Sequence, residues 1–178
     1  KQLISTVPLP KICKMIKSCP KDVLESGKKL LWTTVDLISI GLNKPDIPPP
    51  YLWWYIYNKE NLASRGYSPS QKSPKNAPPG CSSLQFEIYN LSTKERYSPN
   101  LLIENIKKSS LDMNICEEKD IIFIDHKHLP FGNVVFYSDM ESDRKIVNDF
   151  LEKSNIFSCG RFGEWDYFWS DESFMSGK

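Results

Sequence analysis

The most constraining feature of this sequence is its aromatic C-terminal segment, residues 158–178. It contains two tryptophans, one tyrosine and three phenylalanines. Chain ends usually fray and carry small polar residues, whereas this many aromatic rings must be covered by something. Two interpretations stay open: the chain is cut within a larger fold, or the rings line a pocket for a flat ligand. The start at Lys1, without an initiator Met, leads us to expect a fragment.

The composition argues against several classes of function. The 178 residues carry 23 Lys and Arg against 22 Asp and Glu, so no overall field recruits nucleic acid, and we expect no nucleic-acid partner. No apolar run approaches the ~18 residues of a spanning helix, so we expect no membrane span. The five cysteines are odd in number and form no Cys-x-x-Cys pair, which favours reduced thiols and a cytoplasmic location, although a Cys13–Cys19 disulfide stays open.

The hydrophobic pattern predicts an α+β fold with a mostly antiparallel sheet of five to six strands and three to four helices. Pro20 should divide residues 10–26 into two short helices, and amphipathic helices are predicted at 99–113, with Ser98 as the cap, and at 138–153. Strands are predicted at 3–7, 29–42, 51–57, 81–90, 119–128 and 134–137.

The run at 51–57 has five aromatics in seven residues, so we expect both of its faces to be buried or one to line a cavity. The prolines of residues 43–50 predict a stiff connector before it. Residues 58–80 predict a long loop, or a short strand around 64–68 followed by a loop.

The candidate chemistry begins at Gly160-Arg161-Phe162-Gly163. Glycines let a backbone approach a ligand, and the arginine fork can hold a phosphate or a carboxylate. The alternative is a turn with a surface salt bridge. No Gly-x-Gly-x-x-Gly loop, Walker loop or nucleophile motif is found in the sequence.

Other side chains each have a functional and a plain interpretation. Trp165, Tyr167 and Trp169 suit stacking on a flat ring, although an aromatic core is favoured. Asp171 is expected to cap a short helix that begins at Glu172. Two histidines, two residues apart on one predicted strand, should share a face. They are expected to be exposed rather than metal ligands, because no third ligand can be identified, so we expect no metal site. The two are His126 and His128.

The runs CGRFGEWDY at 159–167 and SDESFMSG at 170–177 resemble the C-terminal flavin-contact motif of one flavoenzyme group. This group includes the UDP-galactopyranose mutases and the amine oxidase and protoporphyrinogen oxidase relatives, and the mutase-like branch is the most similar. ISTVPL at 4–9, Trp54-Tyr55 through Ser64-Arg65, and SSLQFE at 82–87 resemble further segments in the same order.

The resemblance implies a two-part enzyme in which FAD is the reactive group, so no catalytic side chain is expected here. Residues 1–157 would form a substrate-binding domain, and residues 158–178 would start the flavin-contact segment. An upstream Rossmann domain, absent from this chain, would hold the FAD. The implied cofactor contacts are Gly160, Arg161, Gly163, Trp165, Asp171 and Ser173. The implied substrate contacts are Tyr55, Arg65, Arg161 and Tyr167, with Arg65 and Arg161 at the phosphates.

The resemblance also implies a small-molecule substrate, either a UDP-sugar or a related polar compound. Asp171 stands where eukaryotic-like mutases have Asn, and its carboxylate would repel a diphosphate. Trp169 stands where bacterial mutases have Asp. These differences favour the flavoenzyme superfamily over the mutase activity itself. The alternatives are an amine oxidase-type oxidoreductase and a non-catalytic, aromatic-lined binding domain.

Overall fold

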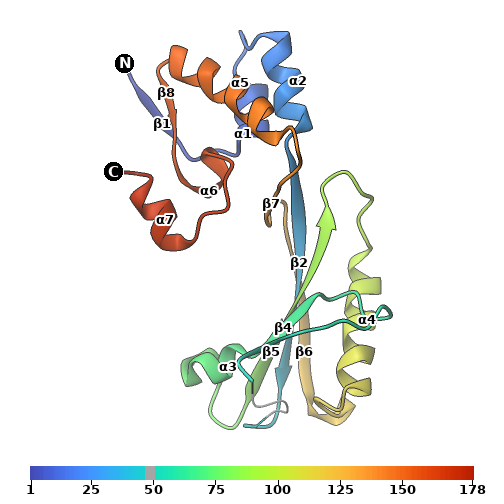
Figure 1. The fold of residues 1–178 in the computed structure, drawn as a ribbon. Coiled ribbons are helices and arrows are strands. Elements are labelled where there is room, and N and C mark those ends of the chain that lie inside the picture. Colours follow the sequence, from blue (N-terminus) through green and yellow to red (C-terminus); the bar gives the residue numbers. More distant parts are fainter. Residues whose placement is uncertain (47–50) are drawn as a thin grey trace. The chain divides into compact units, whose positions relative to one another are not determined.

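The computed structural model describes residues 1–46 and 51–178, which divide into two compact units (Figure 1). The first unit combines Lys1–Thr33 with Asn133–Lys178, and the second is Thr34–Gly132. Strand β2 (Leu31–Leu42) begins in the first unit and continues into the second. Of the connector predicted at 43–50, residues 47–50 lie outside the described residues.

The first unit is built from helices around two short strand pairs. Strand β1 (Leu3–Ser5) pairs in parallel with β8 (Ile156–Ser158), and β7 (Val134–Val135) pairs with the first residues of β2. Its longer helices pack on one another through Leu9, Val23, Val147 and Leu151, which are buried. The helices are α1 (Leu9–Met15), α2 (Lys21–Lys29), α5 (Met140–Lys153), α6 (Gly160–Gly163) and α7 (Ser170–Met175).

The second unit is a sheet with one helix on its buried face. The strand order is β3-β4-β5-β2-β6, and the new strands are β3 (Trp53–Tyr55), β4 (Arg65–Tyr67), β5 (Ser82–Leu91) and β6 (Ile121–Leu129). Helix α4 (Pro99–Asp112) buries Leu102 and Ile106 in one cluster with Ile38, Leu84 and Phe86. Burial of each such side chain contributes about 1.5–3 kcal/mol. The short helices are α3 (Pro69–Lys72), η1 (Pro74–Asn76) and η2 (Glu118–Asp120).

The predicted α+β class is confirmed, with a mostly antiparallel sheet. Four helices of the described chain have seven residues or more, as the hydrophobic periodicity indicated. Pro20 separates α1 from α2, and the Ser98 hydroxyl accepts a hydrogen bond from the Leu101 amide at the start of α4. Helices α3 and α6 were not predicted, because four residues carry no readable period.

The aromatic run at 51–57 is the main correction. Only Trp53–Tyr55 forms a strand, and Trp53, Tyr55 and Tyr57 are all exposed. The opposite face is covered, since the Trp54 ring packs edge-on against Phe86 at 6.1 Å between centroids. Of the two predicted alternatives, burial of both faces was therefore wrong, and a face that lines a cavity stays a prediction. The physical reason is the position of β3 at the edge of the sheet, where it pairs with β4 alone among the described strands.

The domain boundary predicted between residues 157 and 158 stays a prediction. The two compact units of the described residues divide at 33/34 and 132/133. Among the described residues, no helix has both the length and the apolar character needed to cross a bilayer.

Candidate functional site

Arg161 occupies the centre of the terminal motif in the first unit. One Nη atom donates a 2.7 Å hydrogen bond to the side-chain oxygen of Asn133. The guanidinium carbon lies 4.3 Å from the centroid of the Tyr167 ring, which is a cation–π contact. The Nε atom is buried, and none of the described residues accepts a hydrogen bond from it. Neither Asn133 nor Tyr167 carries a negative charge, so these contacts orient the guanidinium without neutralising it.

Asp166, an acidic residue of the motif, is held by a different arginine. The carboxylate of Asp166 accepts a 2.8 Å hydrogen bond from Arg144, which also bonds Glu141 at 2.7 Å. Burial lowers the pKa of Arg144, but the hydrogen bonds and charges of these two carboxylates outweigh it and raise the pKa overall. Asp166 is therefore paired with Arg144 and not with Arg161. The described residues form no salt bridge with Arg161, which was the alternative interpretation of the motif.

Each glycine of the motif occupies a position that disfavours a larger residue. Gly160 has φ = 76°, which favours glycine, and nothing within 4 Å would meet a side chain there. Gly163 is different, because a Cβ at this position would lie 2.8 Å from the backbone oxygen of Ser5. The motif thus passes directly against the last residue of β1. At Gly160 it leaves an open surface.

The three aromatic residues at alternate positions have different fates. Trp165 is fully buried, with its ring 5.9 Å from the Trp32 centroid at an interplanar angle of 85°. Tyr167 and Trp169 are exposed. The core interpretation therefore holds for Trp165 alone. Its role as a cofactor contact stays a prediction. In this structure the Trp165 ring packs against Trp32 in the core of the first unit.

The residue that caps helix α7 is Glu172, and not Asp171 as predicted. Helix α7 begins at Ser170, and the Glu172 carboxylate accepts a 2.7 Å hydrogen bond from the Trp169 amide. Asp171 itself is exposed. Ser173 contributes its backbone oxygen to the Ser176 hydroxyl, which in turn accepts from the Gly160 amide at 2.8 Å. This chain of bonds connects α7 to the start of the motif.

A cavity of about 460 Å³ lies beside the motif in the first unit. Its charged lining comprises five carboxylates, including Glu164 and Asp166, and two cations, Arg144 and Lys145. Arg161 is not among the lining residues. A cavity with this excess of negative charge does not suit a phosphate.

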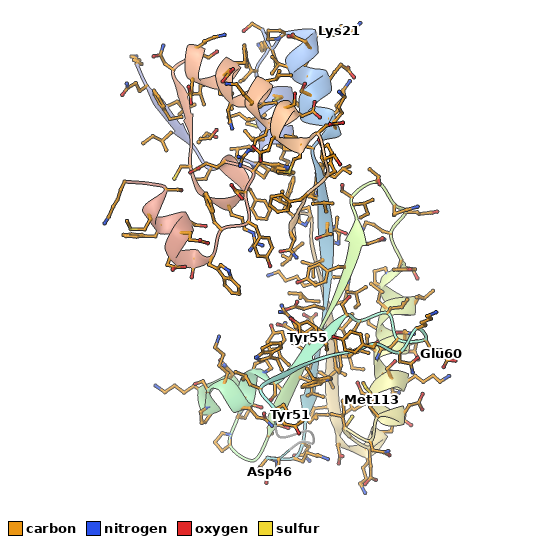
Figure 2. All side chains as sticks on the ribbon, viewed as in Figure 1. Lys21, Asp46, Tyr51, Tyr55, Glu60 and Met113 are labelled. Carbon is orange, nitrogen blue, oxygen red and sulfur yellow. The ribbon has the colours of Figure 1, made fainter. Side chains whose placement is uncertain are left out.

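Arg65 lies on the sheet of the second unit and is already paired. Its Nε and one Nη donate to the same Glu87 oxygen at 3.1 and 2.5 Å, and the Tyr89 hydroxyl donates to that oxygen at 2.6 Å. Burial, the largest single cause, lowers the pKa of Arg65, but the hydrogen bond to Glu87 and the charges of Glu87, Tyr89 and Tyr55 together outweigh it and raise the pKa. Tyr55 is the cross-strand partner of Arg65 and is exposed (Figure 2). The partner Glu87 lay within the SSLQFE resemblance but had no role assigned from the sequence.

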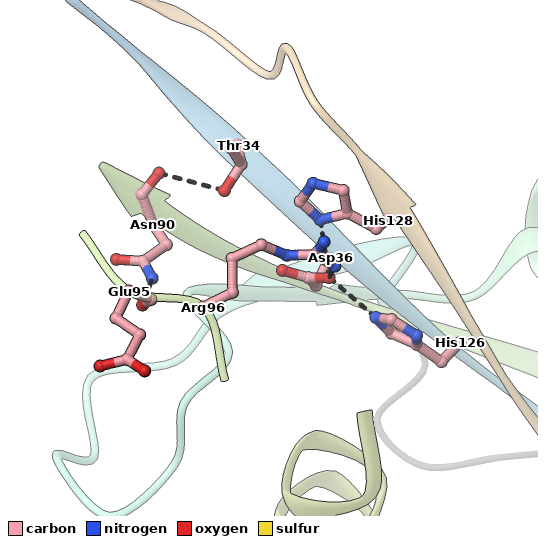
Figure 3. Close-up of polar contacts among 7 residues, drawn as sticks. All are labelled: Thr34, Asp36, Asn90, Glu95, Arg96, His126 and His128. Carbon is pink, nitrogen blue, oxygen red and sulfur yellow. Dashed lines mark hydrogen bonds and ion pairs between the residues drawn. The ribbon is translucent and has the colours of Figure 1, made fainter. Parts of the chain in front are cut away.

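The histidine pair is not exposed, which corrects the sequence interpretation. Both rings bond one oxygen of Asp36, at 2.8 Å from His126 Nε2 and 2.9 Å from His128 Nδ1 (Figure 3). Asp36 is buried, and Arg96 lies 3.7 Å from the same oxygen. The shared face was predicted from the spacing, but Asp36 was not, because it comes from another strand. The described residues contain no cluster that could hold a metal ion.

Comparison with solved structures places this arrangement in a known fold. A crystal structure of reduced UDP-galactopyranose mutase matches 99% of this chain with a TM-score of 0.88 and 26% identity. The chain has a UDP-galactopyranose mutase-like fold. The resemblance inferred from the terminal motif is thereby confirmed, and the fold is flavoenzyme-like.

More distant matches share the mutase-like fold alone. A structure assigned as a protoporphyrinogen oxidase from Exiguobacterium sp. 255-15 covers 90% of the chain, with a TM-score of 0.69 and 11% identity. A Pyrococcus furiosus protein covers 91%, with a TM-score of 0.53 and 15% identity. The chain spans 39%, 36% and 42% of these three structures, respectively. No protein-family model and no curated protein matches the sequence.

Proposed function

We propose that this chain contributes the substrate-binding part of an FAD-dependent enzyme that acts on a nucleotide sugar or a related polar substrate. The observation that carries the proposal is the state of Arg161. Its guanidinium is positioned by Asn133 and Tyr167, and the carboxylate of Asp166 is bonded by Arg144. A preoriented guanidinium without a carboxylate partner suits a phosphate, which it can hold through two parallel hydrogen bonds.

The terminal motif is compatible with a flavin in two respects. The surface at Gly160 is open, so a planar group can approach the backbone there. Arg161 has a buried Nε without a partner, which a ligand oxygen would satisfy. When bound, FAD would supply the reactive centre. We propose that Gly160, Arg161 and Gly163 line its site, with Trp165 beneath and Asp171 and Ser173 on α7.

The residues of this chain would then bind and orient the substrate. Arg161 would stabilise negative charge on a phosphate, and the Tyr167 ring beneath it would fix the direction of the guanidinium. Arg65 would take a smaller part, because Glu87 balances its charge and occupies two of its nitrogen donors. Tyr55, beside Arg65, would offer its ring and hydroxyl.

The proposal is tested on the gene product as encoded, purified without added cofactor. We expect a visible flavin absorbance band and an increase in Tm with UDP. Arg161→Gln should remove the UDP-dependent increase, and Arg161→Lys should restore part of it, because lysine keeps the charge but not the fork. Arg96→Gln, at an exposed arginine of the second unit, is the matched control.

The outcomes separate the alternatives. A flavin band without any response to UDP would favour the oxidoreductase alternative. The absence of a flavin band would favour a non-catalytic binding domain and contradict the proposal. We also propose a cytoplasmic location, since the five cysteines are all free thiols in this structure, as a reducing compartment would leave them.

A further inference from the structure

The face of the sheet opposite α4 carries a hollow of about 510 Å³ that lies entirely in the second unit. The register places Gln85 and Tyr67 on one face across β5 and β4, and Gly41 and Phe123 on one face across β2 and β6. A hydrogen bond between Gln85 and Ser39 joins the two pairs on the same face. The residues used below are Ser39, Tyr67, Lys72, Asn76, Gln85 and Phe123.

Phe123 forms an aromatic platform at one side of this hollow. Its ring lies directly against Gly41, where a methyl group in place of the glycine hydrogen would overlap the ring. Gly41 therefore lets the ring pack against the neighbouring strand. The side chain remains 56% exposed, so the packing leaves much of this apolar surface open to solvent. The exposed part of the ring is an apolar surface on which a ligand can stack.

The rest of the lining is mixed: Ile40, Pro69 and Leu84 are apolar, and most of the other residues are polar and uncharged. The Gln85 amide donates a 2.9 Å hydrogen bond to the Ser39 hydroxyl, which fixes both side chains on the floor. Asn76 is anchored by a 2.9 Å bond to the Pro69 oxygen. Among the described residues, the lining contains no carboxylate, and Lys72 is its one charged member. Tyr67 adds a second ring, and burial raises the pKa of its hydroxyl, so it stays a neutral donor.

We propose that this hollow is a saccharide-binding site, with Phe123 and Tyr67 as the stacking surfaces. A pyranose ring has an apolar face of C–H groups and a rim of hydroxyls, so it matches an aromatic ring bordered by amides and hydroxyls. The volume lies within the ~300–1,000 Å³ of small-molecule sites. The absence of acidic groups from the lining favours a neutral or acidic sugar over an amine. This site does not depend on the flavin or on Arg161.

The test uses the 178-residue chain and cellotetraose, a neutral hexose tetramer, in saturation-transfer NMR and calorimetry. We expect saturation transfer to the sugar, and a loss of affinity of about tenfold or more in Phe123→Ala, which corresponds to ~1.4 kcal/mol. Phe123→Tyr should keep the affinity. Phe136→Ala, which truncates an exposed phenylalanine of the first unit, should leave it unchanged. Because the Phe123 side chain is exposed, its truncation should not unfold the chain, which circular dichroism checks.

A second arm uses the corresponding galacturonate tetramer, which should bind more tightly than the neutral one and lose that advantage in Lys72→Gln. The proposal is overturned if neither tetramer binds, or if both bind Phe123→Ala as well as the wild type. It is also overturned if the face proves to be covered by a second copy of the chain, seen as a dimer that Phe123→Ala dissociates. None of these results depends on FAD or UDP, so failure here is distinguishable from failure of the proposed function.

Discussion

Gly163 shows at the scale of one residue how the terminal motif depends on the start of the chain. A Cβ there would lie 2.8 Å from the Ser5 oxygen and 3.3 Å from the Thr6 Cα, and neither atom can move without the backbone. We predict that Gly163→Ala lowers the free energy of unfolding by about 1–3 kcal/mol, the usual cost of overpacking. Urea denaturation followed by tryptophan fluorescence measures it.

Gly177→Ala is the matched control, because its Cβ would meet neighbours at 3.4 Å or more. It should change the stability by less than half as much. Equal losses in the two variants would show that the close approach of Ser5 does not decide the stability of the motif.

Single residues also show where sequence reasoning ends. The spacing of His126 and His128 predicted their shared face, since alternate residues of a strand point the same way. Their partner Asp36 lies about 90 positions away in the sequence and is brought in by strand pairing. Arg65 and Glu87 are related in the same way. Such partners follow from the register of the sheet, which no local pattern contains.

Helix α7 illustrates the scale of one element. Sequence reasoning found the helix but assigned its cap to Asp171, whereas Glu172 bonds the Trp169 amide. We predict that Glu172→Ala destabilises α7 by about 0.5–2 kcal/mol, the usual effect of a lost cap. Faster hydrogen exchange of the amides at Ser173 and Ser176 would report it. Asp171→Ala keeps the Glu172 bond and should leave exchange near the wild-type rate, and the reverse ranking would restore the sequence interpretation.

Long elements were predictable because their patterns repeat. The alternation in β5 and the helical period in α4 and α5 were all recognised. The burial predicted for strand β3 was wrong for a different reason. Its aromatic run has strong strand propensity, but propensity does not tell an edge strand from a central one. The exposure of Trp53 and Tyr55 follows from the strand order, which only the fold supplies.

At the scale of the whole molecule, the structural match covers 99% of this chain but only 39% of a UDP-galactopyranose mutase. The group could be named from the sequence because the terminal motif is local and dense. The division into two units could not, because the first unit joins residues from both ends of the chain. Cofactor binding depends on which residues of this sequence can hold a pyrophosphate.

We predict that the purified 178-residue chain retains little or no FAD after gel filtration with an excess of the cofactor. FAD carries a pyrophosphate, which flavin-binding folds usually hold on the backbone amides of a Gly-x-Gly-x-x-Gly loop, and this sequence contains none. Arg161 would offer a single guanidinium to balance the negative charge of the pyrophosphate. The ratio of flavin absorbance to protein absorbance measures retention, with a flavoenzyme that carries a Gly-x-Gly-x-x-Gly loop as the positive control. Stoichiometric FAD on the 178-residue chain would mean that the open surface at Gly160 and the guanidinium of Arg161 suffice for tight binding.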